Sequence, residues 1–91
     1  MAKQQRLLLF CGTVQGVGFR YTAHHAAIGC DLTGYVRNLD DGRVECLVEG
    51  DEQQIDEFVA EIYRRMSGYI RSHTQQIAPH SGRYDSFMIA H

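Results

Sequence analysis

The chain has 91 residues, which suffices for one small domain but not for a second core, so we expect residues 1–91 to form a single domain. Hydrophobic residues make up 44% and charged residues 22%, a composition typical of folded globular proteins and not of disordered ones. The formal net charge of −2 and the isoelectric point near 6.2 argue against a nucleic-acid-binding protein, which usually carries a basic face.

The apolar run at 7–11 is too short for the apolar core of a signal peptide and far too short to span a bilayer. We therefore interpret it as a strand and expect a cytoplasmic protein without membrane association. The three cysteines, Cys11, Cys30 and Cys46, are odd in number and contain no close pair, so neither a disulfide framework nor a zinc knuckle is indicated. Buried free thiols are the simpler interpretation.

Strand and helix signals alternate along the first half of the chain. Residues 6–12 are apolar on both faces, as in a central strand. After a glycine-rich loop, residues 21–30 are typical of a short helix whose stripe of small residues would allow close approach to a sheet: Ala23, Ala26, Ala27 and Cys30. Residues 34–39 and 43–50 are strand-like runs around Asp-Asp-Gly, which predicts a hairpin.

Residues 51–66 carry the strongest helical pattern of the chain. Their large apolar residues recur at intervals of three and four and would form one continuous face: Ile55, Phe58, Val59, Ile62 and Met66. Asp51 and Gln54 resemble a capping box at the start of this helix. Residues 69–77 and 84–90 are weaker strand candidates.

This order of elements predicts an α+β fold of the βαββαβ type. The compact solution is a sandwich with an antiparallel sheet of four or five strands and both helices on one face. The first and second strands would run parallel, with the third between them and antiparallel to both, because crossover connections are right-handed. The loop after the first strand and the end of the second strand would then meet at one edge, about 10 Å apart.

The glycine-rich loop "GTVQGVGFRY" has the features of an anion-binding site. Gly16 and Gly18 allow backbone N–H groups to turn inward, and the loop leads into a helix N-terminus, whose free N–H groups favour an anion. Arg20 adds a guanidinium that stays charged at any working pH. Asn38 shares a strand face with Val36, so it would point toward this helix start if Val36 enters the core.

Simpler interpretations of these residues stay open at this point. A glycine-rich turn before a helix also occurs as a plain connection, and this one lacks the Lys and Ser or Thr of a Walker loop. Arg6, Arg37 and Arg43 could join Arg20 in a local positive site. The histidines have no metal-ligand spacing, so a metal site is not expected: His24, His25, His73, His80 and His91.

The segments "GTVQGVGFRYT" and "LTGYVRNLDDGRVECLVEG" resemble the acylphosphatase family. They match its G-x-V-Q-G-V-x-F-R and G-x-V-x-N-x-x-D-G-x-V patterns at the expected separation, firmly over about residues 7–66, and the order of elements extends the likeness to the end of the chain. The resemblance implies a ferredoxin-like fold and hydrolysis of acyl phosphates to a carboxylate and inorganic phosphate, without a metal or cofactor. It also implies a small-molecule partner only, and we expect a monomer.

The resemblance further assigns roles to residues of this chain. Arg20 matches the family's phosphate-binding arginine, and Asn38 matches the asparagine that positions the attacking water. The backbone of six consecutive residues matches its phosphate cradle: Gln15, Gly16, Val17, Gly18, Phe19 and Arg20. The carboxylate leaving group has a conjugate acid with a pKa of only about 4, so the reaction needs no general acid. The loose transition state of phosphoryl transfer also demands little of the nucleophile.

One departure and two alternative functions accompany this interpretation. The first helix closes with Cys30-Asp31-Leu32 where the family usually has Leu-Gly-Leu, so Asp31 must take the left-handed cap position or the helix must end sooner. A carrier module within a larger assembly would bind an acyl or carbamoyl phosphate without hydrolysing it. An RNA-binding domain of similar topology would need exposed aromatic residues on its central strands, where the third strand presents Glu45, Leu47 and Glu49.

Overall fold

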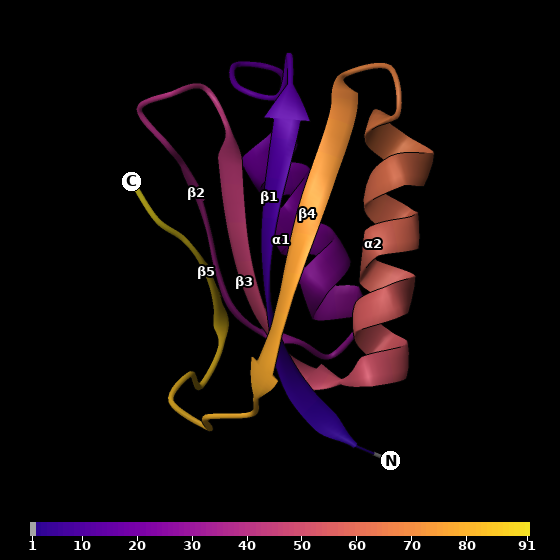
Figure 1. Ribbon diagram of the computed structural model, residues 1–91, viewed down its shortest axis with the longest axis vertical. Coiled ribbons are helices and arrows are strands. Elements are labelled where there is room, and N and C mark those ends of the chain that lie inside the picture. Colours follow the sequence, from indigo (N-terminus) through magenta and orange to yellow (C-terminus); the bar gives the residue numbers. More distant parts are fainter. Residues whose placement is uncertain (1) are drawn as a thin grey trace.

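The computed structural model describes residues 2–91 and contains one five-stranded sheet and two helices (Figure 1). In chain order the elements are β1 (Lys3–Gly12), α1 (Phe19–Gly29), β2 (Thr33–Asn38), β3 (Val44–Asp51), α2 (Glu52–Met66), β4 (Ile70–Pro79) and β5 (Phe87–Ile89). The strand order across the sheet is β4-β1-β3-β2-β5, and both helices cover the same face. The predicted α+β, βαββαβ class is therefore confirmed.

The strand directions agree with the prediction for four strands and differ for the fifth. β3 lies between β1 and β2 and is antiparallel to both, and β4 is antiparallel to β1. β5 pairs in parallel with β2, with Gly34 opposite Phe87, so the complete sheet is mixed and not wholly antiparallel. The reason is the connection after β4, which leads from one edge of the sheet to the other before β5 begins (Figure 1).

A single cluster of buried side chains fills the space between the sheet and the helices. Leu8 and Phe10 of β1 and the predicted α2 residues Ile55, Phe58 and Ile62 are fully buried. Burial of each such side chain stabilises the fold by roughly 1.5–3 kcal/mol. All three cysteines are free thiols, two buried and one half-buried. Within residues 2–91 no helix has the length and apolar character needed to cross a membrane.

α1 begins and ends at residues in the left-handed conformation. Gly18 is the N-cap with φ 81°, so the helix starts at Phe19, two residues before the predicted start. At the other end Asp31 has φ 57°, as one of the two predicted alternatives requires. The Asp31 N–H donates to the carbonyl of Ile28 at 3.1 Å. The N–H of the next residue, Leu32, donates to the carbonyl of Ala27 at 3.0 Å. This is a Schellman motif with a non-glycine residue in the strained position.

Substituting Asp31→Gly is expected to raise the free energy of unfolding by about 1 kcal/mol, because glycine adopts positive φ without the steric cost of a Cβ. Urea denaturation at neutral pH measures the change. Asp31→Ala is the control, since it retains the Cβ and should not stabilise the chain. A gain of equal size in the alanine variant would show that the aspartate charge, and not the backbone conformation, is responsible.

The start of α2 confirms the N-cap but not its predicted partner. The Asp51 side chain accepts a hydrogen bond from the backbone N–H of Gln53 at 3.2 Å. Gln54 is exposed and, among the described residues, its side chain makes no bond back to Asp51, so the predicted capping box is wrong. The single cap satisfies one of the free N–H groups at the helix start.

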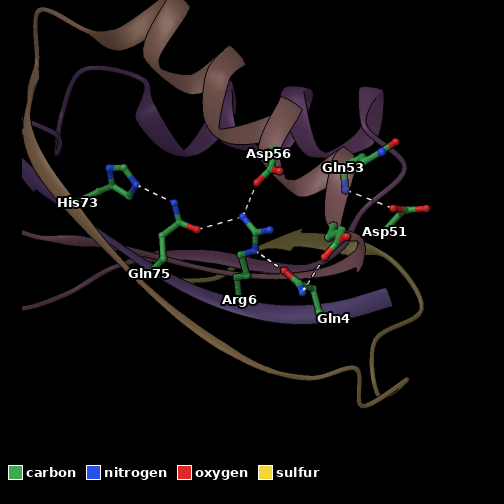
Figure 2. A network of polar contacts seen from close by, with 8 residues as sticks. Gln4, Arg6, Asp51, Gln53, Asp56, His73 and Gln75 are labelled. Atoms are coloured by element: carbon green, nitrogen blue, oxygen red, sulfur yellow. Dashed lines mark hydrogen bonds and ion pairs between the residues drawn. The ribbon is translucent and has the colours of Figure 1, made fainter. Parts of the chain in front are cut away.

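Arg6 is a buried charge on the helix-covered face of β1, with only 7% of its surface exposed. Its guanidinium donates to Asp56 Oδ1 on α2 at 2.7 Å, to Gln75 Oε1 on β4 at 3.1 Å and to Gln4 Oε1 at 2.5 Å (Figure 2). A buried charge is costly unless it is paired and hydrogen-bonded, and these three acceptors supply the pairing. Arg6 therefore joins α2 to one edge of the sheet and does not form a positive site with Arg20.

Glu49 anchors the connection between β4 and β5 on the outer face of β3. Its carboxylate, with 1% of the residue exposed, accepts hydrogen bonds from Gln5 Nε2 at 2.7 Å, from the Ser81 backbone and hydroxyl at 3.0 and 2.6 Å, and from the Gly82 N–H at 3.1 Å. Burial alone would raise the pKa of Glu49, but these donors stabilise the charged form and lower the pKa to about 2.

This lowered pKa predicts acid sensitivity. The stabilisation from Glu49 is present above the ordinary pKa of 4.5 and is lost as the pH falls through that value toward about 2. Between pH 7 and pH 3.5 the loss amounts to about 1 kcal/mol. Urea denaturation should show this loss in the native chain and a smaller one in Glu49→Gln. Glu57→Gln, which changes an exposed carboxylate of α2, is the control and should retain the native pH dependence.

Candidate anion-binding site

A cavity of about 100 Å³ lies where the loop after β1, the start of α1 and the end of β2 meet. We call it the Arg20–Asn38 cavity, after the two residues that the sequence analysis singled out and that the structure places on it together. Its lining consists of Val14, Gly16, Gly18, Phe19, Arg20, Tyr21 and Asn38. Four of the six predicted cradle residues are in this lining, and Gln15 and Val17 are not.

The loop reaches the helix through two residues with left-handed backbone conformations. Gly16 has φ 77° and Gly18 has φ 81°, and a Cβ built at either position would meet no atom within 4 Å. Backbone conformation, and not space, therefore requires glycine there. No side chain caps the N-terminus of α1, and its first turn holds no acidic residue. The N–H groups and the positive end of the helix dipole are thus free to bind an anion.

Gln15 fastens the loop to the connection between β2 and β3. Its side-chain Nε2 donates to the carbonyl of Leu39 at 2.7 Å and to the carbonyl of Arg43 at 3.0 Å. Val17 is half-buried and packs against the core. These two side chains therefore fix the loop beside the end of β2, and the backbone groups of the loop remain the candidates for binding an anion.

Asn38 has an unsatisfied oxygen at this cavity. Its Oδ1 is buried and has no hydrogen-bond partner among residues 2–91. An unpaired buried acceptor costs about 1–3 kcal/mol, so one occurs in a folded protein only for a reason. This unpaired acceptor belongs to one of the two residues that the sequence predicted for the site.

The Arg20 guanidinium is oriented by the segment that follows β5. Its Nη1 lies 3.3 Å from the carbonyl oxygen of Ala90 and 3.2 Å from His91 Nδ1, which must be the acceptor because arginine has only donors. The Ala90 N–H donates in turn to the carbonyl of Val36 at 2.8 Å, which continues the pairing of β5 with β2. Within the described chain the other N–H groups of Arg20 have no protein acceptor, so they are free for a ligand.

The other arginines do not join this site, and Arg37 faces away from it, as its alternation with Asn38 predicts. Arg37 Nε pairs with Glu45 Oε2 at 2.8 Å on the outer face of the sheet, and Arg43 Nε pairs with Asp41 Oδ2 at 2.8 Å in the hairpin. Arg20 is consequently the one residue with a formal charge in the lining of the cavity. Residues 2–91 contain no group of three or more His, Cys, Asp or Glu side chains that could hold a metal ion.

Comparisons with known proteins point to one family. Residues 7–89 match the family model described as Acylphosphatase. The chain is 46% identical over 80 residues to an acylphosphatase of Solibacter usitatus, a match that covers 86% of this chain and 81% of the relative. It is 55% identical over 49 residues to an acylphosphatase of Syntrophotalea carbinolica, where the matched stretch spans 54% of this chain and only 53% of the relative.

A solved structure extends this likeness to the whole fold. The crystal structure of an acylphosphatase from Bacillus subtilis superposes with a TM-score of 0.84 at 32% sequence identity. The superposition covers 98% of this chain and 99% of the other, so it includes every element from β1 to β5 and the loop that lines the cavity.

Proposed function

Because the chain belongs to the acylphosphatase family, we propose that it hydrolyses acyl phosphates to a carboxylate and inorganic phosphate at the Arg20–Asn38 cavity. One observation supports this most directly. Arg20, the uncapped start of α1 and Asn38, whose buried side-chain oxygen has no partner, line a single cavity of about 100 Å³. The guanidinium and the helix N–H groups can bind a phosphoryl group, and Asn38 can bind a water molecule beside it.

Arg20 and the loop backbone bind the phosphoryl group in this proposal. The guanidinium donates to two phosphoryl oxygens in a fork, and the N–H groups of residues 15–20 donate to the others. Charge on the equatorial oxygens changes as the acyl–phosphate bond breaks, and donors already in place stabilise it without reorganisation. The Gln15 clamp and the glycines of the loop keep these donors in position.

Asn38 positions the nucleophile. Its buried Oδ1 accepts a hydrogen bond from a water molecule, which places the water's oxygen toward the phosphorus atom. The water attacks phosphorus as the carboxylate departs, and a phosphoryl oxygen takes the proton. No group in the protein has to act as a general acid, because the carboxylate leaves as a stable anion. The proposed reaction therefore needs neither a metal ion nor a cofactor.

Phosphate release from acetyl phosphate and benzoyl phosphate tests the proposal. The purified chain should release inorganic phosphate from both in the presence of a chelator. Asn38→Ala, purified by the same procedure, is the control for contaminating phosphatases and should show far less release. Saturable binding of the acyl phosphate without release would support the carrier function in place of hydrolysis.

The proposal also covers the assembly state and location of the enzyme. We take it to act as a single-domain monomer in the cytoplasm, which its three free thiols favour because reducing compartments preserve thiols. Light scattering on a sizing column should give the mass of one chain, with or without added reductant. A mass of two chains that persists on dilution would contradict the monomer.

A further inference from the structure

The Arg20–Asn38 cavity is small compared with pockets that enclose a whole ligand. Its volume is about 100 Å³. Pockets that enclose a complete small molecule are usually about 300–1,000 Å³. In the proposed reaction the phosphoryl group and the attacking water occupy this cavity, and a large acyl group lies at its rim.

Tyr21 is the exposed aromatic residue in the lining of this cavity. Val14 and Phe19 also line the cavity, but they are 0% and 2% exposed and belong to the core. Tyr21 is 74% exposed and occupies the first turn of α1, directly after Arg20. The two glycines of the lining have no side chain, so among the lining residues Tyr21 has the one large, exposed aromatic side chain.

The Tyr21 side chain has no structural task that would account for its position. In the part of the chain that the structure describes, its hydroxyl makes no hydrogen bond and its ring is in no aromatic pair. Other tyrosines of the chain are engaged: Tyr63 bonds His73, and Tyr35 bonds Glu45. A free aromatic face beside a phosphoryl site can stack on a planar group attached to the phosphate.

We infer that Tyr21 is a specificity residue, which contacts the acyl group and gives the enzyme a preference for aromatic acyl phosphates over acetyl phosphate. This inference rests on the proposed function, and it adds the substrate class. The aromatic ring of the acyl group stacks on Tyr21 while Arg20 holds the phosphoryl group, so the contact persists from the bound substrate to the transition state. Tyr21 therefore affects kcat/KM for aromatic substrates and has little effect on inorganic phosphate, which has no acyl group.

The first test compares kcat/KM for benzoyl phosphate and acetyl phosphate. In Tyr21→Ala the ratio of the two values should fall about threefold to tenfold, while Tyr21→Phe should retain the native ratio because stacking needs only the ring. Ile28→Ala, at another exposed apolar residue of α1, is the control and should leave the ratio unchanged. An unchanged ratio in Tyr21→Ala, or a parallel loss on both substrates together with weaker phosphate inhibition, would overturn the inference.

The second test needs no turnover and so separates this inference from the proposed function. Calorimetry compares phenacylphosphonate with acetonylphosphonate, two analogues in which a methylene group replaces the scissile oxygen. The native chain should bind the phenacyl compound more tightly, and Tyr21→Ala should lose that margin. Tighter phenacyl binding without hydrolysis of either acyl phosphate would contradict the proposed reaction alone, whereas equal binding of the two analogues would contradict the role of Tyr21.

Discussion

Replacing Arg20 by glutamine is expected to lower kcat/KM for acyl phosphates by about three orders of magnitude and to weaken inhibition by inorganic phosphate in parallel. Arg20 carries the one formal charge in the lining of the cavity, so no neighbouring cation can compensate for its loss. Glutamine retains an N–H donor, so the variant isolates the charge and the fork geometry. Initial rates of phosphate release, with inorganic phosphate as a competitive inhibitor, measure both effects.

Two further variants sharpen this test. Arg83→Gln makes the same change in net charge at an exposed residue outside the cavity. It should leave kcat/KM and the inhibition constant of inorganic phosphate unchanged. Arg20→Lys keeps the charge but loses the bidentate fork. Compared with Arg20→Gln, it should therefore restore more of the affinity for inorganic phosphate than of kcat/KM. Phosphate inhibition that stayed at its native strength in Arg20→Gln would show that the loop backbone alone binds the anion.

Asn38→Ala is expected to lower kcat by about two to three orders of magnitude while phosphate inhibition changes by no more than about twofold. The reason is the buried Oδ1 without a partner, which in the proposed reaction holds the attacking water and does not touch the phosphoryl group. The same steady-state assay gives both numbers. A variant whose main defect was in phosphate binding would exclude the water-positioning role.

Asn38→Asp tests whether this side chain lies close to the phosphoryl group as well as holding the attacking water. The carboxylate has the same shape and can still accept a bond from water, but its charge repels a phosphate at close range. We therefore expect weak phosphate inhibition in the aspartate variant and nearly native phosphate inhibition in Asn38→Ala. Equal phosphate inhibition in both would indicate that the side chain lies too far from the phosphoryl position to sense its charge.

Most of the fold could be predicted because its strongest signals are local. The α2 helix has a continuous apolar stripe, and the β2–β3 hairpin has an Asp-Gly turn between two alternating runs, so their bounds came within one residue of the prediction. β5 has only three residues, and its direction depends on the path of the preceding connection. Glu49 determines that path by binding Ser81 and Gly82, a contact between distant segments that no local pattern reveals.

The site shows the same division between local and long-range information. The predicted topology and the period-two alternation from Val36 to Asn38 were enough to predict that Arg20 and Asn38 share an edge. Three features had no sequence signal: the two bonds of Gln15, the contact of Arg20 with His91, and the exposure of Tyr21. The first two join segments far apart in the sequence. The exposure of Tyr21 follows from where α1 begins, which was predicted two residues too late.

The pairing of β1 has a consequence for how the proposed activity would appear during folding. Gln4 lies opposite Gly50 on β3 and opposite Pro79 on β4, so the central strand cannot be completed until remote parts of the chain have come together. Sheets with such non-local contacts refold in milliseconds to seconds, more slowly than helical bundles. β3 lies between β1 and β2, so the loop after β1 and the end of β2 reach their spacing at the Arg20–Asn38 cavity only when these three strands pair. Recovery of hydrolysis after dilution from denaturant should therefore follow the same time course as the sheet.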